Sequence, residues 1–171
     1  MADGLLVGRF QPFHLGHMSA LRFALGTADR LWIGIGSSNR PPEAANPFTA
    51  AERRDMILSS VDAGTAARIA IYDIPDVANH VRWLDLIDEI VPPFGVVFTN
   101  DRLTESLYSG RRRGAVRTVR IPFLDRDELS GTRIRNMLGG GAPTSDWQRL
   151  VPSGTRDVLR RRGAATRLAD L

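Results

Sequence analysis

Five short strand-like runs, each followed by a stretch with helical periodicity, constrain the fold of this chain more than any other feature. The runs predict strands at residues 5–7, 31–35, 68–74, 95–99 and 116–121. The second run, Leu-Trp-Ile-Gly-Ile, is apolar throughout, as expected of a strand in a parallel sheet that helices cover on both faces. Strands that alternate with helices predict an α/β fold with a doubly wound parallel sheet of about five strands.

Helix signals fill the segments between these strands. Thr49 and Glu52 form the sequence pattern of a capping box, and Ser130 is a good N-cap for a helix that ends near Leu138. Two further helices are predicted at about 145–150 and 155–162, beyond a run of three glycines. We expect one Rossmann-like domain over residues 1–171, with the helices from about 144 as an appendage of the same domain.

Composition excludes several kinds of chemistry. The 171 residues contain no cysteine, which rules out disulfides, thiolate metal sites and cysteine nucleophiles. All 23 basic residues are arginine, so lysine is excluded as a catalytic base. No apolar run approaches the roughly 20 residues of a membrane helix, and Met-Ala-Asp-Gly does not resemble the start of a signal peptide. We therefore expect a cytoplasmic protein without a membrane partner.

The charge is unevenly distributed along the chain. Residues 1–100 contain 8 arginines and 11 acidic residues, whereas residues 101–171 contain 15 arginines and 8 acidic residues. A basic half favours polyanions, from nucleotide triphosphates to nucleic acids. The arginine triplets at 111–113 and 160–162 are more typical of a solvated surface, and no recognition helix accompanies them. Nucleic acid is therefore kept only as a minor alternative partner.

The end of the first predicted strand gathers groups that bind anions. Gly8 ends the strand, a loop begins at Arg9, and His14 and His17 stand at the start of the next helix. In doubly wound sheets ligands bind at the carboxyl ends of the strands, and helix N-termini bind phosphate. This pattern predicts a phosphate site. The alternatives are two surface histidines that cap a helix, or a zinc pair that lacks an obvious third ligand.

A second candidate phosphate site follows the fifth predicted strand. Residues 130–135 read Ser-Gly-Thr-Arg-Ile-Arg, so an N-cap is followed by unpaired backbone N–H groups and two guanidinium groups. By itself this segment is equally consistent with a capped amphipathic helix that carries solvated arginines. Together with the first site it predicts two phosphate cradles on one nucleotide-binding protein.

Two further segments predict contacts to an acceptor. Asp76 follows the third strand and Trp83 lies shortly after it, so an aromatic ring and polar groups are available for a flat heterocycle. Trp83 is equally consistent with a core residue. Arg53 lies one helical turn beyond the Thr49 cap, where it either reaches a phosphate or is simply solvated.

These motifs resemble a known superfamily. Residues 8–17, Gly-Arg-Phe-Gln-Pro-Phe-His-Leu-Gly-His, together with residues 130–135, resemble the two signatures of the nucleotidyltransferases that carry a His-x-Gly-His motif. Within that superfamily the chain is most similar to the archaeal-type nicotinamide-mononucleotide adenylyltransferases. The features that align in order are residues 36–38, 46–53, 75–76 with Trp83, 92–98 and 150–152.

The resemblance implies an activity. Members transfer AMP from ATP to nicotinamide mononucleotide (NMN), giving NAD and pyrophosphate, with Mg²⁺ as cofactor and with direct in-line attack by the acceptor phosphate. They commonly form homo-oligomers, often hexamers. The alternatives are the same chemistry on nicotinate mononucleotide, phosphopantetheine or FMN, or with CTP on a phosphorylated alcohol. A non-catalytic module that binds nucleotides or nucleic acid is the alternative from another class.

The resemblance also implies roles for individual residues, and it assigns no protein ligand to a metal. The catalytic residues are His14, His17, Arg9 and Arg135. The residues implied to bind ATP and its phosphates are Gly8, Phe10, Gly16, Ser130, Gly131, Thr132 and Arg133. The residues implied to bind the acceptor are Gly36, Ser37, Arg53, Asp76, Asn79 and Trp83.

Two departures from the family pattern concern base recognition. Relatives often place an asparagine three residues before the tryptophan, where this chain has His80, with Asn79 one residue earlier. Relatives often have Gly-Asn after the fourth strand, where this chain has Asn100 and Asp101. The preference between nicotinamide and nicotinate forms therefore stays open at the level of sequence.

Overall fold

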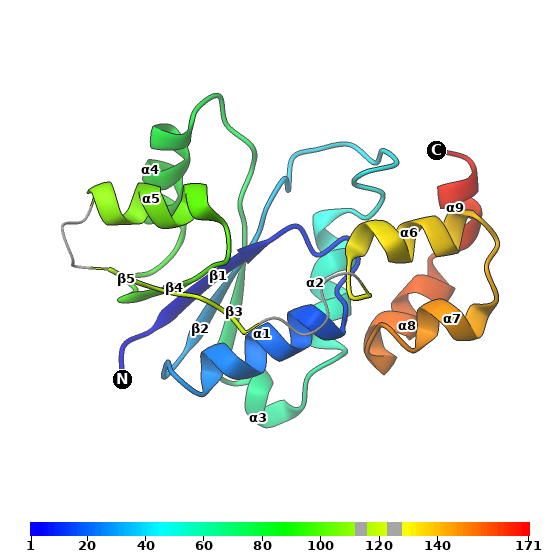
Figure 1. The fold of residues 1–171 in the computed structure, drawn as a ribbon, viewed down its shortest axis with the longest axis horizontal. Helices are drawn as coiled ribbons and strands as arrows, with labels where there is room; N and C mark the ends of the chain where they lie inside the picture. Colours follow the sequence, from blue (N-terminus) through cyan, green and yellow to red (C-terminus); the bar gives the residue numbers. More distant parts are fainter. Residues whose placement is uncertain (112–115, 123–127) are drawn as a thin grey trace. The chain divides into compact units, whose positions relative to one another are not determined.

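A computed structural model describes residues 1–111, 116–122 and 128–171 (Figure 1). The arginine triplet at 111–113 and the loop predicted at 124–129 lie largely outside these residues. The chain divides into two compact units with interleaved sequence. We call residues 1–8, 20–39 and 64–122 the sheet unit, and residues 9–19, 40–63 and 123–171 the helical unit. The single domain expected from the sequence stays a prediction.

The sheet unit confirms the α/β prediction. Its described residues form a five-stranded, all-parallel sheet in the order β3-β2-β1-β4-β5. The strands are β1 (Gly4–Gly8), β2 (Leu31–Ile35), β3 (Ile69–Asp73), β4 (Val96–Phe98) and β5 (Arg117–Val119). The strands β2 and β3 are added on one side of β1, and the later strands β4 and β5 are added on its other side. The topological switch point therefore lies between β1 and β4.

The strand register aligns the carboxyl ends of three neighbouring strands. Gly8 at the end of β1 pairs with Ile35 at the end of β2, and Ile35 pairs with Asp73 at the end of β3. The segments that follow β2 and β3 consequently start side by side. Every residue of β2 is buried, as its continuous apolar sequence predicts.

The helices of the sheet unit cover its core. The helix α4 (His80–Ile90) packs Leu84 and Ile87 into a cluster that also contains Leu5 and Trp32. The helix α5 (Arg102–Arg111) follows β4. The helix α1 (Leu15–Leu25) begins in the helical unit and ends in the sheet unit, and the short α3 (Ala63–Ala66) spans the change between units at residues 63 and 64. The sequence analysis did not predict α3, because four residues are too few to show helical periodicity.

The helical unit confirms the predicted caps. The helix α2 (Ala50–Leu58) begins with a complete capping box between Thr49 and Glu52, and Ser130 caps α6 (Gly131–Gly139). The predicted C-terminal helices are α7 (Thr144–Gln148) and α8 (Ser153–Arg161). A further helix, α9 (Ala164–Ala169), was not predicted. Gly163 makes it possible, because its φ of 59° turns the chain after α8 in the left-handed region that glycine tolerates.

The helix α8 approaches α2 very closely within this unit. A Cβ atom at Gly154 would lie 2.0 Å from the Ser59 carbonyl oxygen, so only glycine fits. The backbone N–H of Thr155 donates to the Ser60 hydroxyl at 3.1 Å. No helix in the described part of the chain is long and apolar enough to cross a membrane.

Candidate active site

The loop that leaves β1 is anchored by aromatic rings. The Phe10 and Phe13 side chains are 2% and 1% exposed, and their ring centroids lie 6.0 Å apart. Phe10 adopts φ of 51°, a conformation that a bulky residue rarely accepts. Such strain persists only where surrounding packing holds it in place. The buried rings of Phe10 and Phe13 therefore fix the conformation of the loop, while the side chain of Arg9 is exposed.

His14 and His17 form a stacked pair at the start of α1. Their ring centroids lie 3.7 Å apart, and the space for the His14 ring depends on Gly16, where a Cβ would lie 3.0 Å from it. The backbone N–H of His17 donates to Nδ1 of His14 at 3.4 Å, and the backbone N–H of His14 donates to Nδ1 of His17 at 3.3 Å. The two imidazoles thus cap the helix reciprocally.

This reciprocal cap determines the tautomers of both rings. A neutral imidazole carries one N–H, and each Nδ1 here accepts a hydrogen bond. The proton must therefore be on Nε2 in both His14 and His17. The helix-capping and phosphate-binding interpretations of the sequence are compatible, since Nδ1 serves the helix and Nε2–H remains a donor.

The two imidazoles are neutral at pH 7. Burial lowers the pKa of His14 to about 4. Burial, and then the neighbouring His14, lower the pKa of His17 well below its usual value. In the ligand-free protein both residues consequently act as neutral hydrogen-bond donors rather than as cations.

The structure brings the second predicted motif to the same loop within the helical unit. Nη1 of Arg135 donates to the Gln11 carbonyl oxygen at 2.8 Å, and its Nη2 donates to the Thr132 hydroxyl at 3.2 Å. A Cβ at Gly131 would lie 2.8 Å from the same carbonyl oxygen and 3.2 Å from Nη1 of Arg135. The hydroxyl of Ser130 accepts the backbone N–H of Arg133 at 3.3 Å. Segments more than a hundred residues apart in sequence thus form one cluster.

This cluster is strongly cationic. Burial, and then the nearby charge of Arg9, lower the pKa of the Arg135 guanidinium. Among the described residues, neither Arg9 nor Arg135 forms an ion pair with a carboxylate. Two guanidinium groups that repel each other without a compensating carboxylate favour the binding of an anion such as phosphate. We call Arg9, His14, His17 and residues 130–135 the phosphate cluster.

Gln11 is a central residue that the sequence analysis missed. Its side chain is 3% exposed and clamps the backbone of Phe48, donating to the carbonyl oxygen at 2.8 Å and accepting from the N–H at 3.0 Å. The same Nε2 donates to Oδ1 of Asn46. With its own carbonyl oxygen bound to Arg135, Gln11 joins three segments. Its polar side chain between Phe10 and Pro12 was the available signal in the sequence.

Arg53 contacts the phosphate cluster through the backbone of Arg9. Its side chain is fully buried, and Nη1 donates to the Arg9 carbonyl oxygen at 2.8 Å while Nε donates to the Thr49 carbonyl oxygen at 3.2 Å. Arg53 therefore supports the backbone of Arg9 from within the helical unit. The contact to the acceptor implied by the family resemblance stays a prediction.

The other predicted acceptor residues lie in the sheet unit, where two strand ends are tied together. The hydroxyl of Ser37 donates to Oδ1 of Asp76 at 2.9 Å. The side chain of Asn39 accepts the Asp76 backbone N–H at 2.8 Å and donates to its carbonyl oxygen at 3.3 Å. The backbone N–H of Gly36 donates to the Gly8 carbonyl oxygen at 2.9 Å. Gly36, Ser37 and Asp76 therefore lie at one edge of the sheet.

Asn79 and Trp83 lie on α4 in the same unit. Oδ1 of Asn79 accepts the backbone N–H of Arg82 at 2.8 Å, so Asn79 is the N-cap of the helix. His80 is the exposed first residue of α4. Trp83 is half-buried and packs against the apolar core of the sheet unit. Trp83 is therefore partly a core residue, as one of the two interpretations of the sequence proposed.

A parallel sheet with a topological switch after β1, and a cationic cluster that includes the loop leaving β1, define a nucleotide-handling α/β protein. The model of the family Cytidylyltransferase-like matches residues 5–137. A nicotinamide-nucleotide adenylyltransferase of Pyrococcus abyssi is 37% identical over 100% of this chain and 89% of its own length. The corresponding protein of Archaeoglobus fulgidus is 34% identical over 96% and 94%.

Solved structures show the same fold. A bifunctional NMN adenylyltransferase/ADP ribose pyrophosphatase from Francisella tularensis superposes with a TM-score of 0.81 and 22% identity. This chain is covered completely and spans 52% of that longer chain. A nicotinic acid mononucleotide adenylyltransferase from Plasmodium falciparum superposes with a TM-score of 0.59 and 14% identity over 96% of both chains.

The chain belongs to the cytidylyltransferase-like family and, within it, to the archaeal-type nicotinamide-nucleotide adenylyltransferases. It is therefore a nucleotidyltransferase. The family resemblance drawn from the two signature motifs is confirmed.

Proposed function

We propose that the protein transfers AMP from ATP to nicotinamide mononucleotide, forming NAD and releasing pyrophosphate. One observation carries this proposal: the Arg9–His17 loop and the Ser130–Arg135 helix start form a single cationic cluster without a carboxylate counterion among the described residues. Relatives that match this chain over most of their length bear the name of this activity.

The reaction is a direct displacement at phosphorus. An oxygen of the acceptor's 5′-phosphate forms a bond to the α-phosphorus of ATP, while the bond from that phosphorus to the bridging oxygen breaks. Pyrophosphate leaves with the electron pair of the broken bond. Because the attacking oxygen is already anionic, no general base is required, and catalysis rests on positioning and charge stabilisation.

The phosphate cluster supplies that stabilisation. The Nε2–H groups of His14 and His17 donate to phosphate oxygens, and Arg9 and Arg135 compensate the charge that moves onto the leaving pyrophosphate. An anion beside a neutral imidazole favours its protonated form. Nucleotide binding therefore raises the pKa of both histidines.

Mg²⁺ is proposed to accompany ATP as the counterion of its phosphates. The described residues contain no group of three His, Asp or Glu side chains placed to hold a metal, and the phosphate cluster is itself cationic. Mg²⁺ is commonly bound through substrate phosphates with few protein ligands. Its chemistry here is neutralisation of the triphosphate charge, and activity should require it.

The sheet unit is proposed to recognise the pyridine ring. Trp83 stacks on the ring, and the carboxylate of Asp76, near Asn79, accepts a hydrogen bond from the carboxamide. The same carboxylate repels the negative charge of a nicotinate. This argument favours nicotinamide mononucleotide over nicotinate mononucleotide as the acceptor.

A substrate panel tests the proposal. Purified protein with ATP and Mg²⁺ is offered nicotinamide mononucleotide, nicotinate mononucleotide, phosphopantetheine and FMN, with CTP and a phosphorylated alcohol as a further pair. Pyrophosphate release and product are measured by chromatography. The expected result is NAD from nicotinamide mononucleotide at the highest kcat/KM, and failure to form NAD would refute the proposal.

The assembly and location of the protein are part of the same proposal. We expect a homo-oligomer in the cytoplasm, and a hexamer is the first state to test. Light scattering at several concentrations measures the oligomer, and a monomer at all of them would exclude it. Nucleic acid is not an expected partner, and salt-steep binding to DNA without turnover would favour the alternative of a binding module.

A further inference from the structure

An ion pair joins the C-terminal helix α9 to the start of α2. Nη1 and Nη2 of Arg167 donate to Oε2 and Oε1 of Glu52 at 2.8 and 2.9 Å, so the pair is bidentate. Glu52 is 6% exposed, and its Oε2 also accepts the Thr49 backbone N–H at 2.9 Å. Nη1 of Arg167 further donates to the Pro47 carbonyl oxygen at 3.2 Å. One guanidinium thus holds both the capping box and the chain that leads into it.

This ion pair is adjacent to the support of the phosphate cluster. Glu52 is followed by Arg53, whose guanidinium holds the Arg9 carbonyl oxygen at 2.8 Å. A displacement of the first turn of α2 would therefore move Arg53 and, with it, the backbone of Arg9. Since Arg9 belongs to the phosphate cluster, the geometry of that cluster depends on α2 being held in place.

The same C-terminal helix contacts the other half of the cluster. The helix α9 packs against α6, and a Cβ at Gly139 would lie 3.3 Å from both Cβ and the carbonyl oxygen of Leu168. The helix α6 begins at its N-cap Ser130 and carries Arg135. The helix α9 therefore contacts the element that carries Arg135 and binds the element that supports Arg9.

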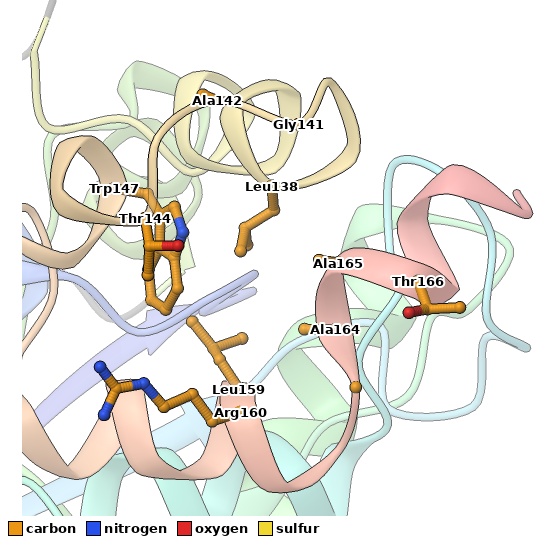
Figure 2. A pocket seen from close by; sticks show the side chains of 11 residues that line it. Leu138, Gly141, Ala142, Thr144, Trp147, Leu159, Arg160, Ala164, Ala165 and Thr166 are labelled. Carbon is orange, nitrogen blue, oxygen red and sulfur yellow. The ribbon is translucent and has the colours of Figure 1, made fainter.

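A partly open cavity borders α9 in the helical unit. The cavity has a volume of about 380 Å³ and lies between α6, α7, α8 and α9 (Figure 2). The side chains of Leu138 and Trp147 extend into it from one side and Leu159 from the other, while Ala164 and Ala165 of α9 form part of its wall. Leu138, Trp147, Leu159 and Ala164 are nonetheless buried, so the apolar side of α9 is packed. The bidentate pair with Glu52 adds a directional polar tie on α2 to this apolar packing.

We propose that Arg167 is a positioning residue for adenylyl transfer, which holds the Arg9 half of the phosphate cluster in register with the Arg135 half through Glu52 and Arg53. The inference rests on the proposed function. Arg167 does not touch the reacting atoms. It fixes the start of α2, from which Arg53 supports the backbone of Arg9.

The first test replaces Arg167 by Gln and compares it with Arg161→Gln. Arg161 is an exposed arginine of α8, so its replacement removes the same charge without the tie to Glu52. Steady-state kinetics are measured at a temperature where circular dichroism shows all proteins folded. We expect Arg167→Gln to lower kcat by about tenfold or more, because small misplacements of catalytic groups are costly. Arg161→Gln should remain within about twofold of the wild type.

A purely structural role would give a different result. In that case Arg167→Gln would lower the melting temperature but leave kcat of the folded protein unchanged, and the proposal would be overturned. If Arg167→Gln does not fold, Glu52→Gln serves instead, because glutamine preserves a capping box while it removes the charge that Arg167 binds. Its kcat should fall in the same way, and an unchanged kcat would equally overturn the proposal.

Chemical rescue distinguishes positioning from other defects. Arg167 is partly exposed, so guanidinium ions in solution have access to the gap that Arg167→Ala leaves. We expect about a threefold or larger recovery of kcat at millimolar guanidinium, with no gain in the wild type measured in parallel. No recovery in Arg167→Ala would contradict the proposal. Wild-type protein in the same assay reports separately on the function, since a wild type that forms no NAD refutes the function and not the ion pair.

Discussion

The two units of this protein hold their proposed ligand-binding residues in different ways. In the helical unit, the phosphate cluster is interlocked, since Gln11, Arg53 and Arg135 all bond to the backbone of the Arg9–His14 loop or its neighbours. In the sheet unit, the proposed acceptor residues Asp76 and Asn79 are exposed, and their side chains bond to Ser37 and to the backbone N–H of Arg82. Rigid support suits chemistry that depends on positioning, and an open edge suits a part of the site that selects among acceptors.

Removal of an imidazole from the phosphate cluster should have the largest effect. We expect His17→Ala to lower kcat by about 10²-fold, because a donor that stabilises developing charge is lost. Steady-state kinetics with saturating ATP and acceptor measure the change. His17→Asn, which retains a side-chain N–H, is the matched variant and should lose less. An unchanged kcat in His17→Ala would remove the distinction between the two units.

A methyl group at Gly131 should be the next most damaging change. The added Cβ would lie 2.8 Å from the Gln11 carbonyl oxygen and would displace it or Arg135. We expect kcat to fall by about thirtyfold in Gly131→Ala, given the sensitivity of catalysis to small misplacements. Gly110→Ala in α5 is the control, because no described atom lies within 4 Å of its added Cβ. Equal activity of the two variants would show that the cluster is less rigid than its hydrogen bonds indicate.

A change in the sheet unit should affect one substrate only. We expect Trp83→Ala to raise KM for nicotinamide mononucleotide by about tenfold while KM for ATP stays within about twofold, because the stacked ring is lost and the phosphate cluster is intact. Trp83→Phe preserves an aromatic face and should show a smaller increase. A parallel rise in both KM values would mean that the two units do not divide recognition in this way.

The pH dependence of stability should report on the helical unit. The folded-state pKa of His14 is lowered to about 4, below its usual value near 6.5. The unfolded chain therefore binds more protons between these values, and the free energy of unfolding should fall as pH drops from 6.5 towards 4. The slope is about 1.4 kcal/mol per pH unit for one such group. Urea titrations of the wild type and of a His14→Asn, His17→Asn double variant measure it, and an equal slope in both would contradict the assignment.

Titration of Glu52 should extend the fall in the free energy of unfolding to lower pH. Burial by itself would raise the pKa of its carboxyl, but the hydrogen bonds from Arg167 and from the Thr49 backbone outweigh it and hold the pKa below the usual value. A carboxyl with a lowered pKa contributes stability that is lost as pH falls through its folded-state pKa. This contribution adds to that of the histidines rather than opposing it.

Much of the fold was predictable because its signals are local. Short apolar or alternating runs predicted all five strands, and the Thr49–Glu52 and Ser130 patterns predicted two helix starts that the structure confirms. The strand order follows only partly from sequence, since the alternation of strands and helices does not state on which side of β1 each later strand lies. The helix α9 was missed because it is only six residues long and follows an arginine run and a glycine.

The sequence by itself determined which chemical groups this protein carries and on which elements they lie. The two signature motifs identified the histidines, the arginines and the helix start, because these groups bind phosphate when they lie close together. Only the tertiary structure decided how they are held. The bonds from Arg135 to Gln11 and from Arg167 to Glu52 span 124 and 115 residues, and the proton on Nε2 follows from where each Nδ1 bonds. Such pairings depend on how distant segments pack, which no local pattern of residues specifies.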